Sequence, residues 1–109
     1  MDIFDAVQNG DIIRVRELLD SGVDPDSKYE FNGKTPLHVA SGLGHTDIVE
    51  LLLEYDANPN IKDITGNTSL IYASQKNYID IVRLLLEYDA NPNIRNNIGD
   101  NNGDTSLIL

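Results

Sequence analysis

The side chains with the widest chemical range in this 109-residue sequence are its two histidines, His38 and His45. A zinc site needs about three or four ligands, and the chain has no cysteine and no third histidine to complete one. Ser41, His45 and Asp47 supply the residue types of a nucleophilic triad. Neither a nucleophile elbow nor an oxyanion-hole motif accompanies them, so we expect no catalytic residue and no metal site.

Two further motifs raise the question of a bound ion or phosphate group. Asp100, Asn102 and Asp104 have the alternating spacing of a calcium loop, but Thr105 stands where that loop requires glycine. Asn and Asp side chains of this kind also form turns with the backbone, which is the interpretation we favour. The Gly42–Gly44 pair is too short for a phosphate-binding loop and does not follow a strand. We therefore expect no cofactor.

Composition narrows the classes of partner. Acidic residues outnumber basic ones by 18 to 8, giving a formal net charge of -10. Because such a surface repels phosphate groups, we expect neither nucleic-acid binding nor docking on an anionic membrane. The sequence has no run of about 18 apolar residues and no signal segment at its start, so we expect a cytoplasmic protein. Export without a cleaved signal is the alternative.

An internal repeat is the strongest pattern in the chain. Residues 47–61 read DIVELLLEYDANPNI and residues 80–94 read DIVRLLLEYDANPNI, so 14 of 15 positions agree at an offset of 33. Residues 33–37 recur at 66–70 and, with an offset of 37, at 103–107. A weaker copy at an offset of 34 opens the chain and matches Ala6, Gly10 and Val15 to Ala40, Gly44 and Val49. A fixed period of this length predicts stacked units of secondary structure.

The first helix of each unit is predicted to be short. In the best-formed unit it runs over about residues 36–41, with Thr35 as N-cap and proline at the first helical position. Thr68 takes the capping place in the next unit. We expect Gly42 and Gly44 to break the chain after this helix.

A second helix is predicted over about residues 47–55, because apolar residues recur there at helical spacing. Thr46 is the expected N-cap. The chain is expected to turn left-handed at Asp56, and Pro59 prevents the helix from resuming. Residues 60–66 are polar and rich in turn formers, which favours an extended, hairpin-like loop.

Residues 35–40 read TPLHVA and resemble the T-P-L-H-x-A signature of the ankyrin-repeat family, whose period of about 33 residues also agrees. The resemblance implies an all-α fold, a solenoid of helix-turn-helix units joined by hairpin-like loops. It also implies that His38 hydrogen-bonds the backbone of an adjacent loop. We divide this single domain into an atypical unit, two repeats, and a long loop with a truncated repeat: residues 1–29, 30–62, 63–95 and 96–109.

Several positions depart from the family pattern. Asp56 and Asp89 stand where the family usually has glycine, so we expect modest local destabilisation there. The loop over residues 95–104 is four residues longer than its counterpart, because the offset of the repeat grows from 33 to 37. We expect Leu85 and Leu86 to expose apolar surface at this uncapped end. A longer natural array or a partner would then cover it, and weak end-to-end association of an otherwise monomeric protein is expected.

In the ankyrin-repeat family the loops and first helices line a concave, partner-binding surface. When this surface is carried over to the matching positions of the present sequence, the resemblance implies that a partner contacts Tyr29, Phe31, Asn32, Lys34, Leu43, Lys62, Ile64, Thr65, Asn67, Gln75, Lys76 and Arg95. Gly42 lies on the same surface, beside Leu43. Tyr29 or Phe31 folding back onto the neighbouring loop is the alternative for the aromatic residues. The acidic residues of the second helices are expected on the opposite face, and the interpretation we favour is that they form a solvated surface without a specific role. The alternative is that the concave face, being less negative, accepts a partner that the acidic face repels.

The predicted function is a protein–protein interaction module without catalysis, and the sequence does not identify the partner. The alternative is a structural spacer, or the N-terminal segment of a longer ankyrin solenoid attached to another functional domain. Asparagine and isoleucine are abundant, as in AT-rich genomes. Delivery into a host cell is therefore an option if the source is an intracellular bacterium or a virus.

Overall fold

The computed structural model describes residues 2–94, and in this range the chain forms six α-helices and no strand. The described part is elongated, with principal extents of 43 × 28 × 21 Å. The expected all-α fold is confirmed. In chain order the helices are α1 (Ile3–Gln8), α2 (Ile12–Asp20), α3 (Pro36–Leu43), α4 (Thr46–Glu54), α5 (Ser69–Gln75) and α6 (Ile79–Glu87).

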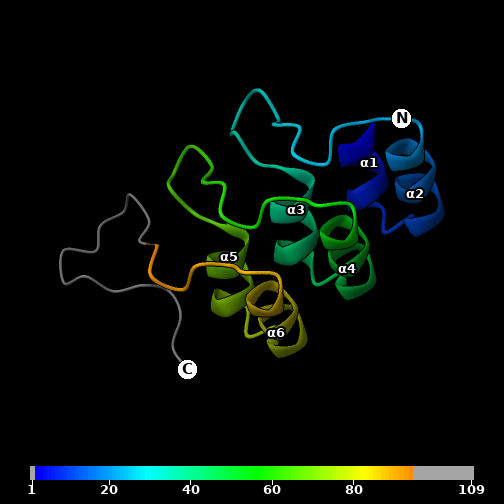
Figure 1. Cartoon of the computed structure of the whole chain (residues 1–109). Helices are drawn as coiled ribbons and strands as arrows, with labels where there is room; N and C mark the ends of the chain where they lie inside the picture. The colour runs from blue at the N-terminus through cyan, green and yellow to red at the C-terminus, as the bar shows by residue number, and fades with distance from the viewer. Residues whose placement is uncertain (1, 95–109) are drawn as a thin grey trace.

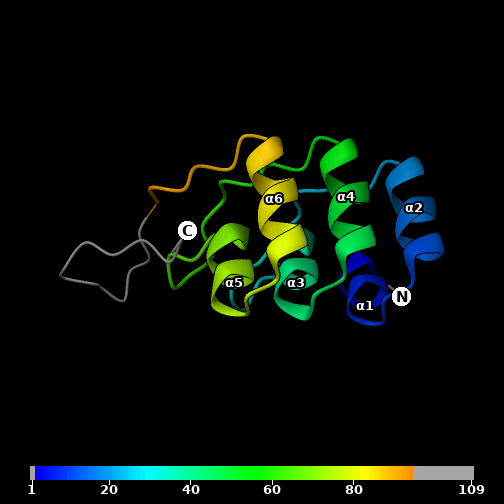
Figure 2. The same cartoon turned by 90° about the horizontal axis from the view of Figure 1, so that it is seen from below.

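The helices form two rows, which Figure 2 shows most clearly. Helices α1, α3 and α5 make one row, and α2, α4 and α6 make the other. Each helix packs on the other member of its unit and on its counterpart in the neighbouring unit. Two long loops extend away from the helices in Figure 1. We call residues 24–34 the first finger and residues 58–67 the second finger.

The first helices begin as expected. The Thr35 hydroxyl accepts a hydrogen bond from the backbone N–H of His38, and the His38 ring accepts one from the backbone N–H of Thr35. The Thr68 hydroxyl likewise accepts a hydrogen bond from the backbone N–H of Ile71, but Ile71 has no side-chain acceptor to return one. The end of α3 differs from our expectation, because Gly42 stays helical. The break comes at Gly44 alone, where the backbone becomes left-handed with a φ of 80°.

The expected N-cap of the second helix was wrong. Helix α4 begins at Thr46, and the residue that caps it is His45, whose side chain makes no capping hydrogen bond. The backbone of His45 is non-helical, with φ -83° and ψ 78°. Its ring instead lies against Gly10 of the preceding unit, where an added Cβ would stand 3.4 Å from the ring. Contact between units therefore takes precedence over local capping at this position.

The left-handed positions follow the sequence pattern. Asp56 and Asp89 adopt φ values of 66° and 71°, and Gly22 adopts 101° at the corresponding place in the opening unit. Asn77 replaces Gly44 in the third unit and keeps a positive φ of 62°. The three non-glycine residues carry steric strain that glycine would avoid.

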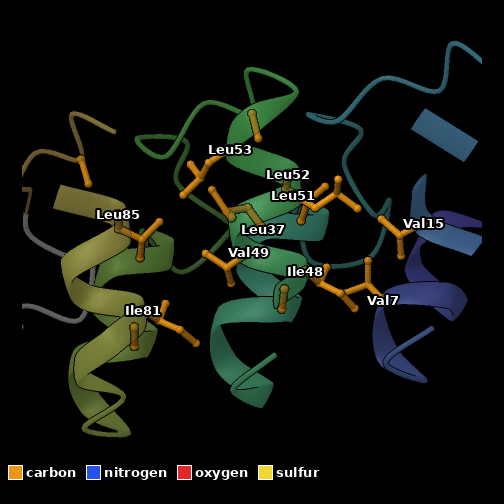
Figure 3. Packing of buried hydrophobic residues seen from close by; sticks show 14 of the residues in the cluster. Val7, Val15, Leu37, Ile48, Val49, Leu51, Leu52, Leu53, Ile81 and Leu85 are labelled. Atoms are coloured by element: carbon orange, nitrogen blue, oxygen red, sulfur yellow. The ribbon is translucent and has the colours of Figure 1, made fainter. Parts of the chain in front are cut away.

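One hydrophobic core runs through all three described units (Figure 3). Val15, Leu52 and Leu85 come from three successive units and are each 0% exposed. The expectation that Leu85 exposes apolar surface was therefore wrong, since its side chain belongs to the core between α4, α5 and α6. Leu86 is partly buried and packs against the same cluster.

Polar side chains link the units beside the fingers. Asp26 accepts a hydrogen bond from the backbone N–H of Asn58 at 2.8 Å, and Asn60 accepts one from the N–H of Asn91 at 2.7 Å. Within a unit, Asn58 accepts from the N–H of Asn60 at 2.9 Å, which forms a turn around the intervening proline. The recurring NPN sequence thus satisfies the backbone both within a unit and in the next one.

Candidate protein-binding face

A hollow of about 550 Å³ opens on the face formed by α1, α3 and the first finger. Its volume lies within the range of ligand-binding clefts. The lining combines aromatic, acidic, basic and small side chains, contributed by Asp2, Phe4, Asp5, Gln8, Tyr29, Asn32, Lys34, His38, Val39, Gly42, Leu43 and Lys76.

Three aromatic rings follow one another from α1 to the first finger, and the first two, Phe4 and Tyr29, line the hollow. Tyr29 packs edge-on against Phe4 with the ring centroids 5.4 Å apart, and Phe31 lies 5.4 Å from Tyr29 on its other side. Tyr29 thus links the first finger to helix α1. The Phe31 side chain is 74% exposed, so most of its apolar surface is accessible to a partner.

Two lysines border the hollow at its other end. The Lys34 ammonium lies 4.8 Å from the centroid of the Tyr72 ring, a cation–π contact between the first finger and α5. The Lys76 ammonium lies 3.4 Å from the backbone oxygen of Gly42. Neither lysine forms an ion pair with another residue in the range 2–94.

The first finger is held by backbone contacts. The N–H of Tyr29 donates to the oxygen of Lys34 at 2.8 Å, and the N–H of Ile64 donates to the oxygen of Asn32 at 2.9 Å. Gly33 sits between them with a φ of 70°, and a Cβ there would stand 3.3 Å from the backbone nitrogen of Ile64. Glycine is therefore required where the two fingers meet.

Asp63 organises the second finger. Its carboxylate accepts hydrogen bonds from the N–H of Thr65 at 3.0 Å, the N–H of Asn67 at 2.9 Å and the hydroxyl of Tyr72. Burial alone would raise the pKa of Asp63, but these hydrogen bonds outweigh burial and hold the pKa below its usual value. The carboxylate is thus charged at neutral pH and fixes the loop beside Lys34.

His38 joins α3 to the second finger, as the ankyrin resemblance implied. Its Nε2 lies 2.9 Å from the backbone oxygen of Asn67, and its Nδ1 accepts from the N–H of Thr35 at 2.9 Å. Burial lowers the pKa of His38, which keeps the ring neutral. The ring is 2% exposed, so it supports the wall of the hollow rather than offering a reactive group.

The hollow brings together five of the residues predicted to contact a partner, namely Tyr29, Asn32, Lys34, Leu43 and Lys76, and it also includes Gly42. Another five are exposed but lie outside it, namely Phe31, Lys62, Ile64, Thr65 and Gln75. The prediction that Asn67 faces a partner is corrected, because this residue is 7% exposed. Its side chain donates hydrogen bonds to Thr65 of the second finger and Tyr72 of α5. Arg95 lies outside the described residues, as do the long third loop and the calcium-like motif.

Sequence reasoning missed the contribution of helix α1. Phe4, Asp5 and Gln8 all line the hollow, together with the N-cap residue Asp2. A signal for this was present, since the offset of 34 that relates the first two units takes Gly42 to Gln8. The atypical first unit lacks the signature of the others, which hid its equivalent role.

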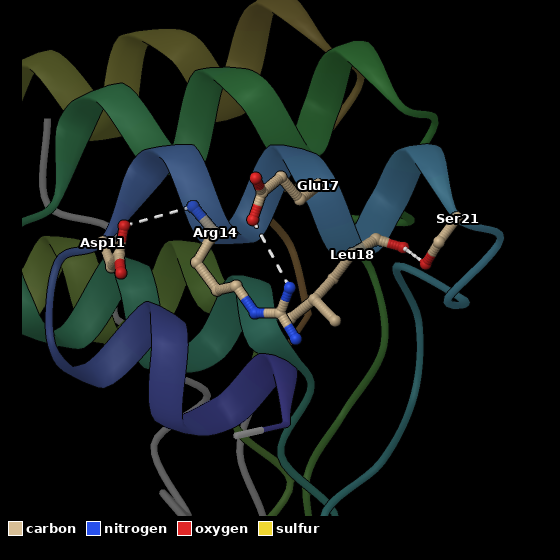
Figure 4. A network of polar contacts seen from close by, with 5 residues as sticks. All are labelled: Asp11, Arg14, Glu17, Leu18 and Ser21. Carbon is tan, nitrogen blue, oxygen red and sulfur yellow. Dashed lines mark hydrogen bonds and ion pairs between the residues drawn. The ribbon is translucent and has the colours of Figure 1, made fainter.

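The opposite face carries the second helices, and its acidic residues are solvent-exposed. Asp47, Glu50 and Glu54 of α4 are exposed, as are Asp80 and Glu87 of α6. On α2, Asp11 caps the helix by accepting from the N–H of Arg14 at 3.1 Å, and the Arg14 guanidinium donates to Glu17 at 3.3 Å (Figure 4). These are surface contacts that stabilise the helix locally.

Two other kinds of site are absent from residues 2–94. Among residues 2–94, no group of three or more His, Asp or Glu side chains is arranged to hold a metal ion. In the same range, no helix is long and apolar enough to cross a membrane.

Comparison with known proteins accounts for the repeat. Residues 3–96 match the family model described as ankyrin repeats (3 copies). The chain is 47% identical over 55 residues to the 2-5A-dependent ribonuclease of Mus musculus. This match covers 50% of the chain and 8% of that relative. The chain is also 39% identical over 61 residues to an ankyrin repeat-containing protein of Schizosaccharomyces pombe. This match covers 56% of the chain and 29% of that relative.

A third relative gives the same picture. The chain is 43% identical over 53 residues to the ankyrin repeat, SAM and basic leucine zipper domain-containing protein 1 of Mus musculus, and this match covers 49% of the chain. The match covers 11% of that relative. The chain therefore spans less than a third of the length of each of these three proteins.

Proposed function

Because the chain belongs to the ankyrin-repeat family, whose repeats generally bind proteins, we propose that it binds a protein partner through the hollow and the two fingers, without catalysis. The observation that carries the proposal is one hollow lined by Tyr29, Leu43 and two lysines, Lys34 and Lys76, that form no ion pair within residues 2–94. The exposed ring of Phe31 lies next to Tyr29. Accessible aromatic anchors beside polar groups are typical of protein interfaces.

Charge gives this face a distinct character. The lining contains two acids, Asp2 and Asp5, and two bases, Lys34 and Lys76, so its formal charge is 2 minus 2, or zero. The whole chain carries -10. A negatively charged partner that approaches the hollow therefore meets less electrostatic repulsion than one that approaches the acidic helices α4 and α6. The absence of cysteine is compatible with a cytoplasmic setting for this binding.

A second candidate is a structural role as part of a longer ankyrin solenoid attached to another functional domain. It is favoured by the matches to relatives of which the chain covers between 8% and 29%. A spacer would hold its neighbouring domains at a fixed separation and would not need a particular set of accessible side chains on one face. Substitutions around the hollow should therefore weaken partner binding if the chain is a binding module, and should leave it unchanged if the chain is a spacer.

Affinity capture from a lysate of the source organism tests the proposal. The bait is the wild-type chain, beside a Phe31→Ala/Lys34→Glu/Lys76→Glu variant whose helical content is checked by circular dichroism. The matched control is Ile13→Ala/Arg16→Glu/Arg83→Glu, which makes the same changes at exposed positions of α2 and α6. We expect a protein that the wild type and the control retain and the first variant loses. Equal retention by all three baits would support the spacer.

A further inference from the structure

Four charged side chains border the hollow, and none of them forms an ion pair with another residue of the described chain. Asp2 and Asp5 belong to the α1 end, where the backbone N–H of Asp5 donates to Asp2 at 2.9 Å. Lys34 and Lys76 belong to the α5 end, where they contact Tyr72 and Gly42. The hollow is thus acidic at one end and basic at the other.

The separation of these ends sets the size of a ligand. Helices α1, α3 and α5 are neighbours in one row. The Lys76 ammonium lies against Gly42 of α3 and the Lys34 ammonium against Tyr72 of α5, so the basic groups lie between one and two packing steps from α1. Packed helices lie about 8–10 Å apart, which places the two ends about 8–20 Å from each other. An extended peptide advances about 3.3 Å per residue and spans this distance with about three to six residues.

The acidic end has features that favour arginine. Phe4 and Tyr29 line the hollow beside Asp2 and Asp5, and the two rings pack edge to face. A guanidinium group binds carboxylates with two parallel hydrogen bonds and also stacks on aromatic rings. An ammonium group offers neither the fork nor the planar face.

Building on the binding function proposed above, we propose that the hollow binds an extended segment of the partner protein with an arginine at the α1 end and a carboxylate at the α5 end. Asp5, Phe4 and Tyr29 receive the arginine. Lys76 and Lys34 receive the Asp or Glu side chain, about three to six residues away along the segment. The opposed charges fix the direction in which the segment lies across the concave face.

Selection from a phage-displayed library of random 12-residue peptides tests this inference on the full chain. The baits are the wild type, Asp5→Lys and Lys76→Glu. The matched controls are Glu50→Lys and Arg83→Glu, which make the same charge changes at exposed positions of α4 and α6. Asp2 is left unchanged because it caps α1. Circular dichroism confirms that each bait is folded.

We expect the wild type and both controls to select peptides with an arginine and an acidic residue about three to six positions apart. Asp5→Lys should lose the arginine preference and keep the acidic one, and Lys76→Glu should do the reverse. For a synthetic selected peptide, each site variant should weaken binding about tenfold or more.

The inference is overturned if no motif is enriched, or if the charge preferences are the same for all five baits. Such a result leaves the binding function itself open to the separate affinity-capture experiment. If capture succeeds there while the peptide preferences fail to respond here, the partner uses the face without the charged pattern proposed for it.

Discussion

The ring of His38 joins two repeat units, because its Nε2 lies 2.9 Å from the backbone oxygen of Asn67 in the following finger. Its Nδ1 accepts a hydrogen bond from the backbone N–H of Thr35, so the neutral ring carries its proton on Nε2 and donates it to Asn67. One side chain thus caps α3 and fixes the second finger, and both contribute to the wall of the hollow.

Replacement of His38 by alanine is therefore expected to destabilise the protein. The change leaves a buried carbonyl without its donor and opens a small cavity, which should lower the free energy of unfolding by about 2–3 kcal/mol. Urea denaturation measures the effect. Ile79→Ala at a position that is 44% exposed is the control and should change stability by less than about 0.5 kcal/mol. A similar small loss for His38→Ala would contradict the linking role.

The lowered pKa of His38 predicts a dependence of stability on pH. Burial disfavours the charged ring, so the unfolded chain binds a proton more readily than the folded one. The stabilisation is complete above the ordinary pKa of about 6.5 and is lost as the pH falls through the folded value. We expect stability to decline as the pH falls below about 6.5, the ordinary pKa of histidine. His38→Gln should remove most of this decline, and an unchanged profile would disprove the assignment.

Tyr72→Phe tests the network of the second finger. The change removes the hydroxyl that donates to Asp63 and should cost about 1–2 kcal/mol at neutral pH. Because hydrogen bonds hold the pKa of Asp63 low, their stabilisation is present above the ordinary carboxyl pKa and is lost as the pH falls through the folded value. The variant should therefore lose less stability on acidification than the wild type. Tyr88→Phe, at an exposed position, serves as the control.

Gly44 and Gly42 form a matched pair for the backbone of α3. Gly44 has a φ of 80°, and an added Cβ would stand 3.0 Å from the Tyr78 ring, so Gly44→Ala should destabilise by about 1–3 kcal/mol. Gly42 is helical and has no atom within 4 Å of an added Cβ, so Gly42→Ala should stabilise by about 0.5–1 kcal/mol. Thermal unfolding distinguishes the two. Equal effects would mean that the left-handed turn does not end the helix.

Asp56→Gly is expected to stabilise the protein. Asp56 has a φ of 66° at the position that Gly22 occupies in the opening unit, so glycine relieves strain and should raise stability by about 0.5–1 kcal/mol. Asp80→Gly, at an exposed position in the first turn of α6, should instead lower it by about 1 kcal/mol. Chemical denaturation measures the free energy of unfolding of both variants. A loss of stability in Asp56→Gly would contradict the inferred backbone strain at Asp56.

Most of the fold could be predicted from the sequence because the same local signals for helix starts and turns recur in successive repeats. Thr35 and Thr68 both precede a short apolar run, and both cap a helix as predicted. The errors came where contacts between units prevail. His45 caps α4 in place of Thr46 because its ring packs against Gly10, a contact that no local pattern indicates.

The candidate site was predicted only in part. Position within the repeat correctly indicated that Lys34 and Lys76 border one hollow, although they are 42 residues apart in the sequence. It did not indicate that Asn67 turns inward to Thr65 and Tyr72, because an amide side chain serves equally well as a surface group and as an internal donor.

Site-specific photo-crosslinking tests the central claim most directly. A photoreactive phenylalanine analogue is placed at Phe31, beside the hollow, and in a second protein at Glu50 on the exposed side of α4. The account predicts that irradiation in cell lysate joins one protein partner to the first position and not to the second. Crosslinking of the same partner from position 50, with none from position 31, would show that the acidic face binds the partner and would contradict the account.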